Sequence, residues 1–178
     1  MKSVLVKGTR IDFKIDKELV KDGTINKKEF YYPQGIIDYV KENNSSKKSL
    51  TTKFFYNEIK FNKNEKYKIL ISFNEDENSS LNSYCNTIET PDGGSHENSV
   101  KNSILKSIRL YGQKNQIKKI PNININDIFD YSDAFISIFI NEPSFEGQTK
   151  KRIVMPKLQK KLEELIQNDF LLWLNSNK

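Results

Sequence analysis

The sequence is poor in the residue types that build cross-links and metal sites. Its 178 residues include one cysteine, Cys85, one histidine, His96, and one alanine, Ala134. A single cysteine excludes an internal disulfide and a metal site with two cysteine ligands, and it fits a reducing cytoplasm. The most apolar window, residues 134–140, is too short to cross the ~30 Å of hydrocarbon in a bilayer. We therefore expect a cytoplasmic protein without a membrane segment.

Length and charge set the next bounds. A chain of this length corresponds to one domain, so residues 1–178 are predicted to form a single domain. Lys and Arg number 29 and Asp and Glu 23, which leaves a net charge of +6. This excess permits a polyanionic partner such as nucleic acid but does not require one. The sequence has no P-loop, no Ser-His-Asp signature and no metal-ligand spacing.

Apolar spacing predicts both strands and helices. The expected strands cover residues 8–15, 30–32, 55–61, 67–73, 81–87 and 134–140. Four helices are expected. The first follows Gly35, and the second is capped by Ser95 and stops at Gly112. The third is capped by Asn126, and the fourth starts at Pro156. The three strands between residues 55 and 87 are expected to pair as antiparallel neighbours. The predicted fold class is α+β, with a mainly antiparallel sheet and helices packed on it.

Two places carry side chains that could do chemistry. His96 follows two glycines in the first turn of a helix, where a structural role is favoured over a base or phosphate contact. Gln148, Thr149 and Lys150 follow a buried strand and a glycine. An amide, a hydroxyl and an ammonium group together suit the oxygens of a terminal phosphate and a nearby water. From these residues alone, a solvated loop remains the alternative.

Three segments of the chain carry a family resemblance. They are residues 30–39 (FYYPQGIIDY), 84–97 (YCNTIETPDGGSHE) and 143–150 (PSFEGQTK). They resemble, in order and spacing, the second or "transducer" domain of the B subunits of bacterial type II topoisomerases, which are DNA gyrase and topoisomerase IV. Residues 83–86 and 168–173 look more like topoisomerase IV. The resemblance implies a fold like domain 2 of ribosomal protein S5, with a left-handed βαβ crossover.

The resemblance also implies roles for the loop. By this match, Lys150 contacts the γ-phosphate of ATP and is the catalytic lysine, Gln148 binds the phosphate or the attacking water, and Thr149 orients the loop. ATP and Mg²⁺ are bound in the intact subunit, whose ATPase and cleavage regions are expected to flank this chain. The chain alone is expected to bind neither, to contain no metal site and to hydrolyse no ATP.

The implied partners are DNA, the ATPase domain of the same subunit, a second copy of the B subunit and the topoisomerase A subunit. Sequence-independent DNA phosphate contacts are expected from basic residues on and after the helix that begins near residue 95. These residues are Lys101, Lys106, Arg109, Lys118 and Lys119. Two alternatives remain open: a stand-alone nucleic-acid-binding domain of S5-like fold, and the equivalent domain of a mismatch-repair or chaperone ATPase.

Overall fold

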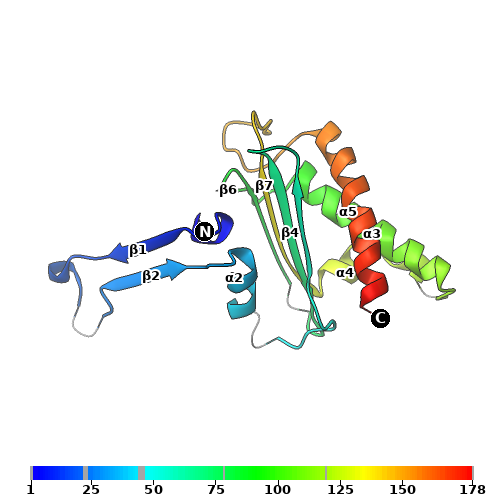
Figure 1. Ribbon diagram of the computed structural model, residues 1–178, viewed down its shortest axis with the longest axis horizontal. Helices are drawn as coiled ribbons and strands as arrows, with labels where there is room; N and C mark the ends of the chain where they lie inside the picture. The colour runs from blue at the N-terminus through cyan, green and yellow to red at the C-terminus, as the bar shows by residue number, and fades with distance from the viewer. Residues whose placement is uncertain (1, 22–23, 44–46, 78, 119, 178) are drawn as a thin grey trace. The chain divides into compact units, whose positions relative to one another are not determined.

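The computed structural model divides the chain into two compact units, Met1–Ser46 and Lys47–Lys178 (Figure 1). It describes residues 2–21, 24–43, 47–77, 79–118 and 120–177, so Lys119 lies outside the described residues. The length of the chain predicts one domain over residues 1–178, whereas the structure has two units. Length alone does not predict this division, because it carries no information on strand pairing. Among the described residues, the two strands of the first unit form a separate sheet.

The N-terminal unit contains a two-stranded antiparallel sheet and short helices. Its strands pair with Arg10 opposite Tyr31 and Lys14 opposite Lys27. Its elements are α1 (Lys2–Leu5), β1 (Arg10–Lys14), η1 (Lys17–Leu19), β2 (Lys27–Tyr31) and α2 (Ile36–Asn43). Both strands are mostly exposed, and the buried apolar side chains of this unit lie on its two α-helices.

The C-terminal unit is built on a five-stranded sheet with the order β3-β4-β7-β5-β6. The strands are β3 (Phe55–Lys60), β4 (Lys66–Phe73), β5 (Ser80–Cys85), β6 (Ile88–Glu89) and β7 (Ser132–Phe139). Strand β7 pairs with β4 antiparallel, with Ile69 opposite Ile136, and with β5 parallel, with Ser83 opposite the same residue. The α+β class and the mainly antiparallel sheet are confirmed.

One predicted strand pairing is wrong. The sequence predicts β4 and β5 as antiparallel neighbours, but β7 lies between them. Seven of the eight residues of β7 are buried, and its side chains alternate between the two faces of the sheet. A strand buried in this way gains most from a central position, where both of its edges are hydrogen-bonded. The order of the strands along the chain does not show that β7 takes the position between β4 and β5.

Helices α3 (Ser95–Lys114) and α5 (Pro156–Ser176) cover one face of this sheet (Figure 1). The apolar core between them and the sheet includes Ile104, Ile136 and Phe170. The short elements η2 (Ile120–Asn122) and α4 (Asn126–Phe129) connect α3 to β7. Because β5 and β7 are parallel, β5, α3 and β7 form a βαβ crossover. Its left-handedness and the likeness to ribosomal protein S5 stay predictions.

Three predicted helix ends differ in the structure. Ser95 is the first residue of α3 rather than its N-cap, and Gly94 takes the cap position. The helix continues past Gly112 to Lys114, and the absence of a side chain at Gly112 leaves room for Ile120. At α4, the carboxamide of Asn124, two residues before the expected cap, accepts hydrogen bonds from the first amides of the helix. No helix within the described ranges is long and apolar enough to span a membrane.

A buried carboxylate at the start of β7 ties the sheet together. Asp133 is 6% exposed and accepts hydrogen bonds from Asn74 at 2.8 Å and Ser80 at 2.5 Å. Asp133 also forms an ion pair of 2.7 Å with the ammonium group of Lys47. No local pattern predicts this cluster, because its members are spread over 86 positions of the chain.

Candidate functional site

The loop after β7 is a paired hairpin with an exposed tip. The outgoing arm (residues 144–146) bonds to the return arm (residues 151–155) through two backbone hydrogen bonds of 2.9 Å, from Glu146 N–H to Arg152 O and from Val154 N–H to Ser144 O. The tip (residues 147–150) lies between these arms. It follows that the loop has its own backbone pairing and is not simply a solvated connection.

The tip presents the three predicted polar side chains to solvent. Gln148, Thr149 and Lys150 are all exposed. Within the described part of the chain, no hydrogen bond or ion pair engages their side chains. Gly147 and Lys150 both have positive φ values, +76° and +55°, so the backbone turns sharply at each end of the tip. The left-handed conformation is uncommon for a lysine and is typical of a tight turn or a functional position.

The return arm also pairs with the glycine turn that precedes α3 (residues 92–95). Asp92 N–H donates to Lys151 O at 3.1 Å, Ile153 N–H donates to Gly93 O at 3.1 Å, and Ser95 N–H donates to Ile153 O at 2.9 Å. The return arm is thus the central segment of a three-segment ladder. The sequence shows two glycines before the helix and a loop at residues 148–150, but it does not predict that the two segments pair.

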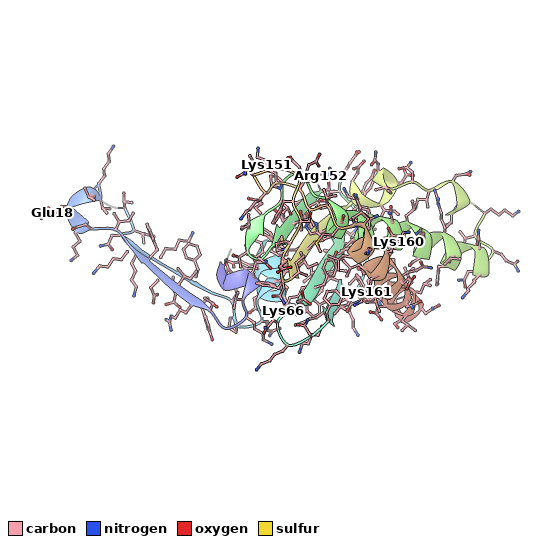
Figure 2. The ribbon with its side chains drawn as sticks, turned by 90° about the horizontal axis from the view of Figure 1, so that it is seen from above. Glu18, Lys66, Lys151, Arg152, Lys160 and Lys161 are labelled. Carbon is pink, nitrogen blue, oxygen red and sulfur yellow. The ribbon has the colours of Figure 1, made fainter. Side chains whose placement is uncertain are left out.

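Side chains reinforce this ladder at two points. The Arg152 guanidinium donates to Asp92 O at 3.1 Å and forms an ion pair of 3.2 Å with Glu146. The hydroxyl of Ser95 accepts a 2.8 Å hydrogen bond from Met155 N–H, directly before α5. Figure 2 labels Lys151 and Arg152 on the return arm. None of these side chains was predicted as a functional group, and only the glycine doublet marked the place in the sequence.

His96 lies beneath the glycine turn in a buried polar network. Its Nε2 atom is 3.1 Å from the hydroxyl of Thr90, which is 2.8 Å from the hydroxyl of Ser83. Its carbonyl accepts a 2.5 Å hydrogen bond from the buried Tyr67 phenol. Burial lowers the pKa of His96 from 6.5 to about 4, so the ring is neutral at pH 7. These contacts assign His96 the structural role that the sequence favoured.

The neutral state of His96 makes folding stability depend on pH. Because the pKa is lower in the folded chain, the unfolded chain binds more protons between pH 6.5 and 4. The contribution of the neutral His96 ring to the free energy of unfolding is fully present above pH 6.5. Roughly 3 kcal/mol of this free energy is lost as the pH falls from 6.5 to 4. Urea unfolding of the chain at pH 7 and pH 4.5 measures the loss. His96→Gln keeps a partner for Thr90 but cannot titrate, so its stability should fall less; equal losses in both proteins would contradict the expectation.

The predicted DNA-contact residues of α3 are partly engaged within the protein. Lys101 forms a 2.6 Å ion pair with Glu97, and Lys106 forms one of 2.9 Å with Glu163. Arg109 donates two hydrogen bonds to the carbonyl of Ile123, at 2.6 and 3.2 Å. Lys118 is exposed beyond the end of the helix. The structure therefore does not bring all of the predicted residues together as free cations.

Lys106 and Arg109 do share one groove between α3 and α5. Its other lining residues are Leu110, Gln113 and Gln167, and its volume is about 280 Å³. Burial by itself raises the pKa of the Glu163 carboxylate beside the groove, but three side-chain hydrogen bonds outweigh burial and lower that pKa; the donors are Asn102, Lys106 and Gln159. Glu163 is thus held ionised, and it fixes the position of the Lys106 ammonium.

Metal-ligating side chains do not cluster in the parts of the chain that the structure describes: no three His, Cys, Asp or Glu residues come close enough to hold an ion. The lone thiol, Cys85, is buried in the core, and burial raises its pKa to about 11. It stays protonated and unreactive at neutral pH.

Comparison with known proteins identifies the family. The family model of DNA gyrase B matches residues 35–178. The chain is 34% identical over 99% of its length to the B subunit of DNA topoisomerase 4 from Rickettsia felis, of which it covers 27%. It thus spans about a quarter of the length of the curated relatives that it matches.

Solved structures agree with the fold. The topoisomerase IV ATP binding domain of Francisella tularensis, in complex with a small-molecule inhibitor, matches 99% of this chain and 46% of that chain, with a TM-score of 0.77 and 25% identity. The B subunit of DNA gyrase from Myxococcus xanthus matches 98% of this chain and 53% of that chain, with a TM-score of 0.80 and 16% identity. At that lower identity the second match shows the fold alone.

Proposed function

Because the chain belongs to the DNA gyrase B family, we propose that it couples ATP binding and hydrolysis to DNA strand passage within the B subunit of a type II topoisomerase. In this proposal the C-terminal unit is the transducer domain. The tip of the loop after β7 reaches the γ-phosphate of ATP held by an ATPase domain of the same subunit. Topoisomerase IV is favoured over gyrase, since the first relatives matched carry that name.

The observation that carries the proposal is the tip itself. A paired hairpin carries the side chains of Gln148, Thr149 and Lys150 at its exposed tip. No described residue forms a hydrogen bond or ion pair with these side chains. A paired hairpin fixes the backbone from which the ammonium group projects and leaves its charge available to a ligand. An unengaged lysine at a tight turn next to an amide and a hydroxyl suits the oxygens of a terminal phosphate.

The three side chains would have separate tasks at the phosphate. The Lys150 ammonium would lie against the γ-phosphate oxygens, where negative charge is stabilised during transfer. The Gln148 amide would donate to a phosphate oxygen or hold the attacking water, and the Thr149 hydroxyl would fix the tip. These contacts last only while the γ-phosphate is present, so the loop would also report ATP occupancy.

The direct test is ATP turnover by a subunit that contains this chain, with Lys150 changed to alanine. Loss of turnover with an unchanged fold supports the proposal. Normal turnover would favour the alternative of a nucleic-acid-binding domain of S5-like fold without a nucleotide role. The chain alone should hydrolyse no ATP, since a lysine and an amide on an exposed tip cannot enclose a nucleotide.

DNA is the proposed substrate, and the groove between α3 and α5 supports phosphate contacts by Lys106 and Arg109. Such contacts release counterions, so affinity for duplex DNA should fall as salt rises, with each phosphate contact adding ~0.9 to the slope of log K against log salt. Changing both residues to glutamine should lower that slope by about 2. A fluorescence titration of duplex DNA at several salt concentrations measures it.

The matched control changes two other exposed lysines, Lys53 and Lys60, to glutamine. It removes the same charge outside the groove and should alter the slope less. Equal slopes for the two double variants would mean that the groove is not where DNA binds. Lys101 and Lys118 remain proposed contacts from the sequence, and neither of them lines the groove. The contact at Lys119 stays a proposal from the sequence alone.

The remaining partners follow from the proposed role. They are the ATPase domain of the same subunit, a second copy of the B subunit and the topoisomerase A subunit, and the proposed location is the cytoplasm. ATP and Mg²⁺ would be held by the intact subunit. This chain would supply the ammonium, amide and hydroxyl groups of the tip to the nucleotide.

A further inference from the structure

The glycine turn before α3 is the partner that fixes the direction of the return arm. We infer that Gly94 is a positioning residue for Lys150, and that the turn links the tip mechanically to α3. This inference rests on the proposed function of Lys150. It adds the route by which an event at the tip reaches the rest of the unit.

The return arm and the glycine turn are joined by a continuous backbone ladder. Lys151, the residue after the proposed phosphate-binding lysine, accepts a hydrogen bond from Asp92 N–H, and Ile153 bonds to Gly93 and Ser95 through both its N–H and its C=O. Gly94 and Ile153 form a parallel β-bridge. The connection from Lys150 to the first residue of α3 is therefore made by backbone groups, which have no side-chain rotamers to absorb a movement.

Gly94 has no space for a side chain. Its φ is +123°, and a Cβ atom there would lie 2.2 Å from Ile153 O and 2.6 Å from Ile153 N. Both contacts are to backbone, so a side chain at position 94 can fit only if the return arm shifts by roughly 1 Å. Gly94 is also the N-cap of α3. One residue thus sets both the start of the helix and its distance from the return arm.

The glycine turn is also bonded to the residue that precedes α5. The hydroxyl of Ser95 accepts from Met155 N–H, and Ser103 and Ser107 of α3 donate to α5 carbonyls at 3.0 and 3.2 Å. The two helices that border the basic groove are therefore joined to each other and to the return arm. A displacement of the tip on phosphate binding would be passed to α3 and α5 together.

The decisive experiment uses the subunit that contains this chain. In Gly94→Ala, the kcat for ATP should fall by a factor on the order of 10 to 100, because a shift of about 1 Å misplaces the ammonium. The KM for ATP should change less than about threefold, since the enclosing pocket lies outside this loop. Hydrogen exchange at the amides of Ser95 and Ile153 should become faster, while exchange in β4 and β7 should not.

Gly8→Ala is the matched control. Gly8 also has a positive φ, +81°, but nothing lies within 4 Å of a Cβ atom built there. Gly8→Ala also places a side chain at a positive φ but without a clash against neighbouring backbone, so kcat and the exchange at Ser95 and Ile153 should stay as in the unchanged subunit. A loss of kcat in Gly8→Ala equal to that in Gly94→Ala would overturn the inference.

A milder pair of variants keeps the test valid if Gly94→Ala does not fold. Ser95→Ala removes the hydroxyl that Met155 N–H uses, and Ser95→Thr restores a hydroxyl. The kcat should fall about threefold to tenfold in the first and recover in the second, consistent with loss of one hydrogen bond of about 1 kcal/mol. Equal kcat values in the two variants would contradict a positioning role for this turn.

The outcomes separate this inference from the proposed function. Normal turnover in Lys150→Ala would overturn the proposed phosphate contact, and the positioning role with it. Low turnover in Lys150→Ala with normal kcat in Gly94→Ala, despite faster exchange at Ser95 and Ile153, would overturn the inference alone. Low kcat in both with normal KM in Gly94→Ala supports both.

Discussion

Lys150→Ala should lower ATP turnover by the intact subunit about 10²–10³-fold, or about 3–4 kcal/mol in the barrier. The reason is that a preorganised ammonium stabilises charge on the phosphoryl oxygens during transfer, and alanine offers no donor. ATP-driven strand passage should fall in parallel. Gln148→Ala should have the same effect more weakly, because a neutral amide stabilises charge less than an ammonium does. A coupled ATPase assay with a supercoil relaxation assay measures both.

Lys151→Ala is the matched control for this variant. Lys151 is the neighbouring exposed lysine, and its contact with the glycine turn is made by its backbone carbonyl, which alanine retains. Its turnover should therefore stay close to that of the unchanged subunit. Melting curves should be the same for both variants, since neither side chain supports the core. Near-normal turnover in Lys150→Ala would exclude the phosphate contact, and a collapsed melting curve would instead give Lys150 a structural role.

Asp133→Ala should destabilise the chain by about 3–5 kcal/mol. The substitution leaves the Lys47 ammonium without its carboxylate and removes the acceptor of Ser80 and of the Asn74 amide, a residue only 1% exposed. Removing one partner of a partly buried ion pair and leaving buried donors unpaired both cost free energy. Urea unfolding at pH 7, followed by circular dichroism, gives the free energy of unfolding.

Two further variants make this measurement specific. Asp130→Ala removes an exposed carboxylate three residues earlier and should change the free energy of unfolding by less than about 0.5 kcal/mol. Asp133→Asn keeps an acceptor oxygen but not the charge, so its loss should be intermediate. If Asp133→Ala were as stable as Asp130→Ala, the cluster at the start of β7 would contribute nothing to the sheet.

The sequence predicts the local elements of the fold and the residues of the tip, but it does not predict what the tip residues contact. The apolar run at residues 134–140, the spacing along residues 95–112 and the helix from Pro156 are local patterns, and the structure confirms each of them within a few residues. The tip residues could also be named, because they follow one another in the chain. What these residues contact was not predictable, since their neighbours in space come from distant segments.

The paired ions on α3 illustrate this limit. The sequence shows Lys106 and Arg109 as two basic residues on one helix, which suggests two free cations. In the structure Lys106 is paired with Glu163 from α5, and Arg109 is bonded to the carbonyl of Ile123. A charge run on a helix reports where the charges are but not which of them the fold neutralises.

The sequence by itself predicted the longer strands and helices but not the short elements α1, η1, β6 and η2, and its motifs identified the loop and the family. Tertiary structure alone decided that β7 separates β4 from β5, that Ser95 bonds to Met155 rather than capping α3, and that the glycine turn pairs with the return arm. The physical reason is the range of the forces. Apolar periodicity and turn chemistry act within a few residues, whereas strand order and backbone pairing are settled by competition among segments far apart in the chain.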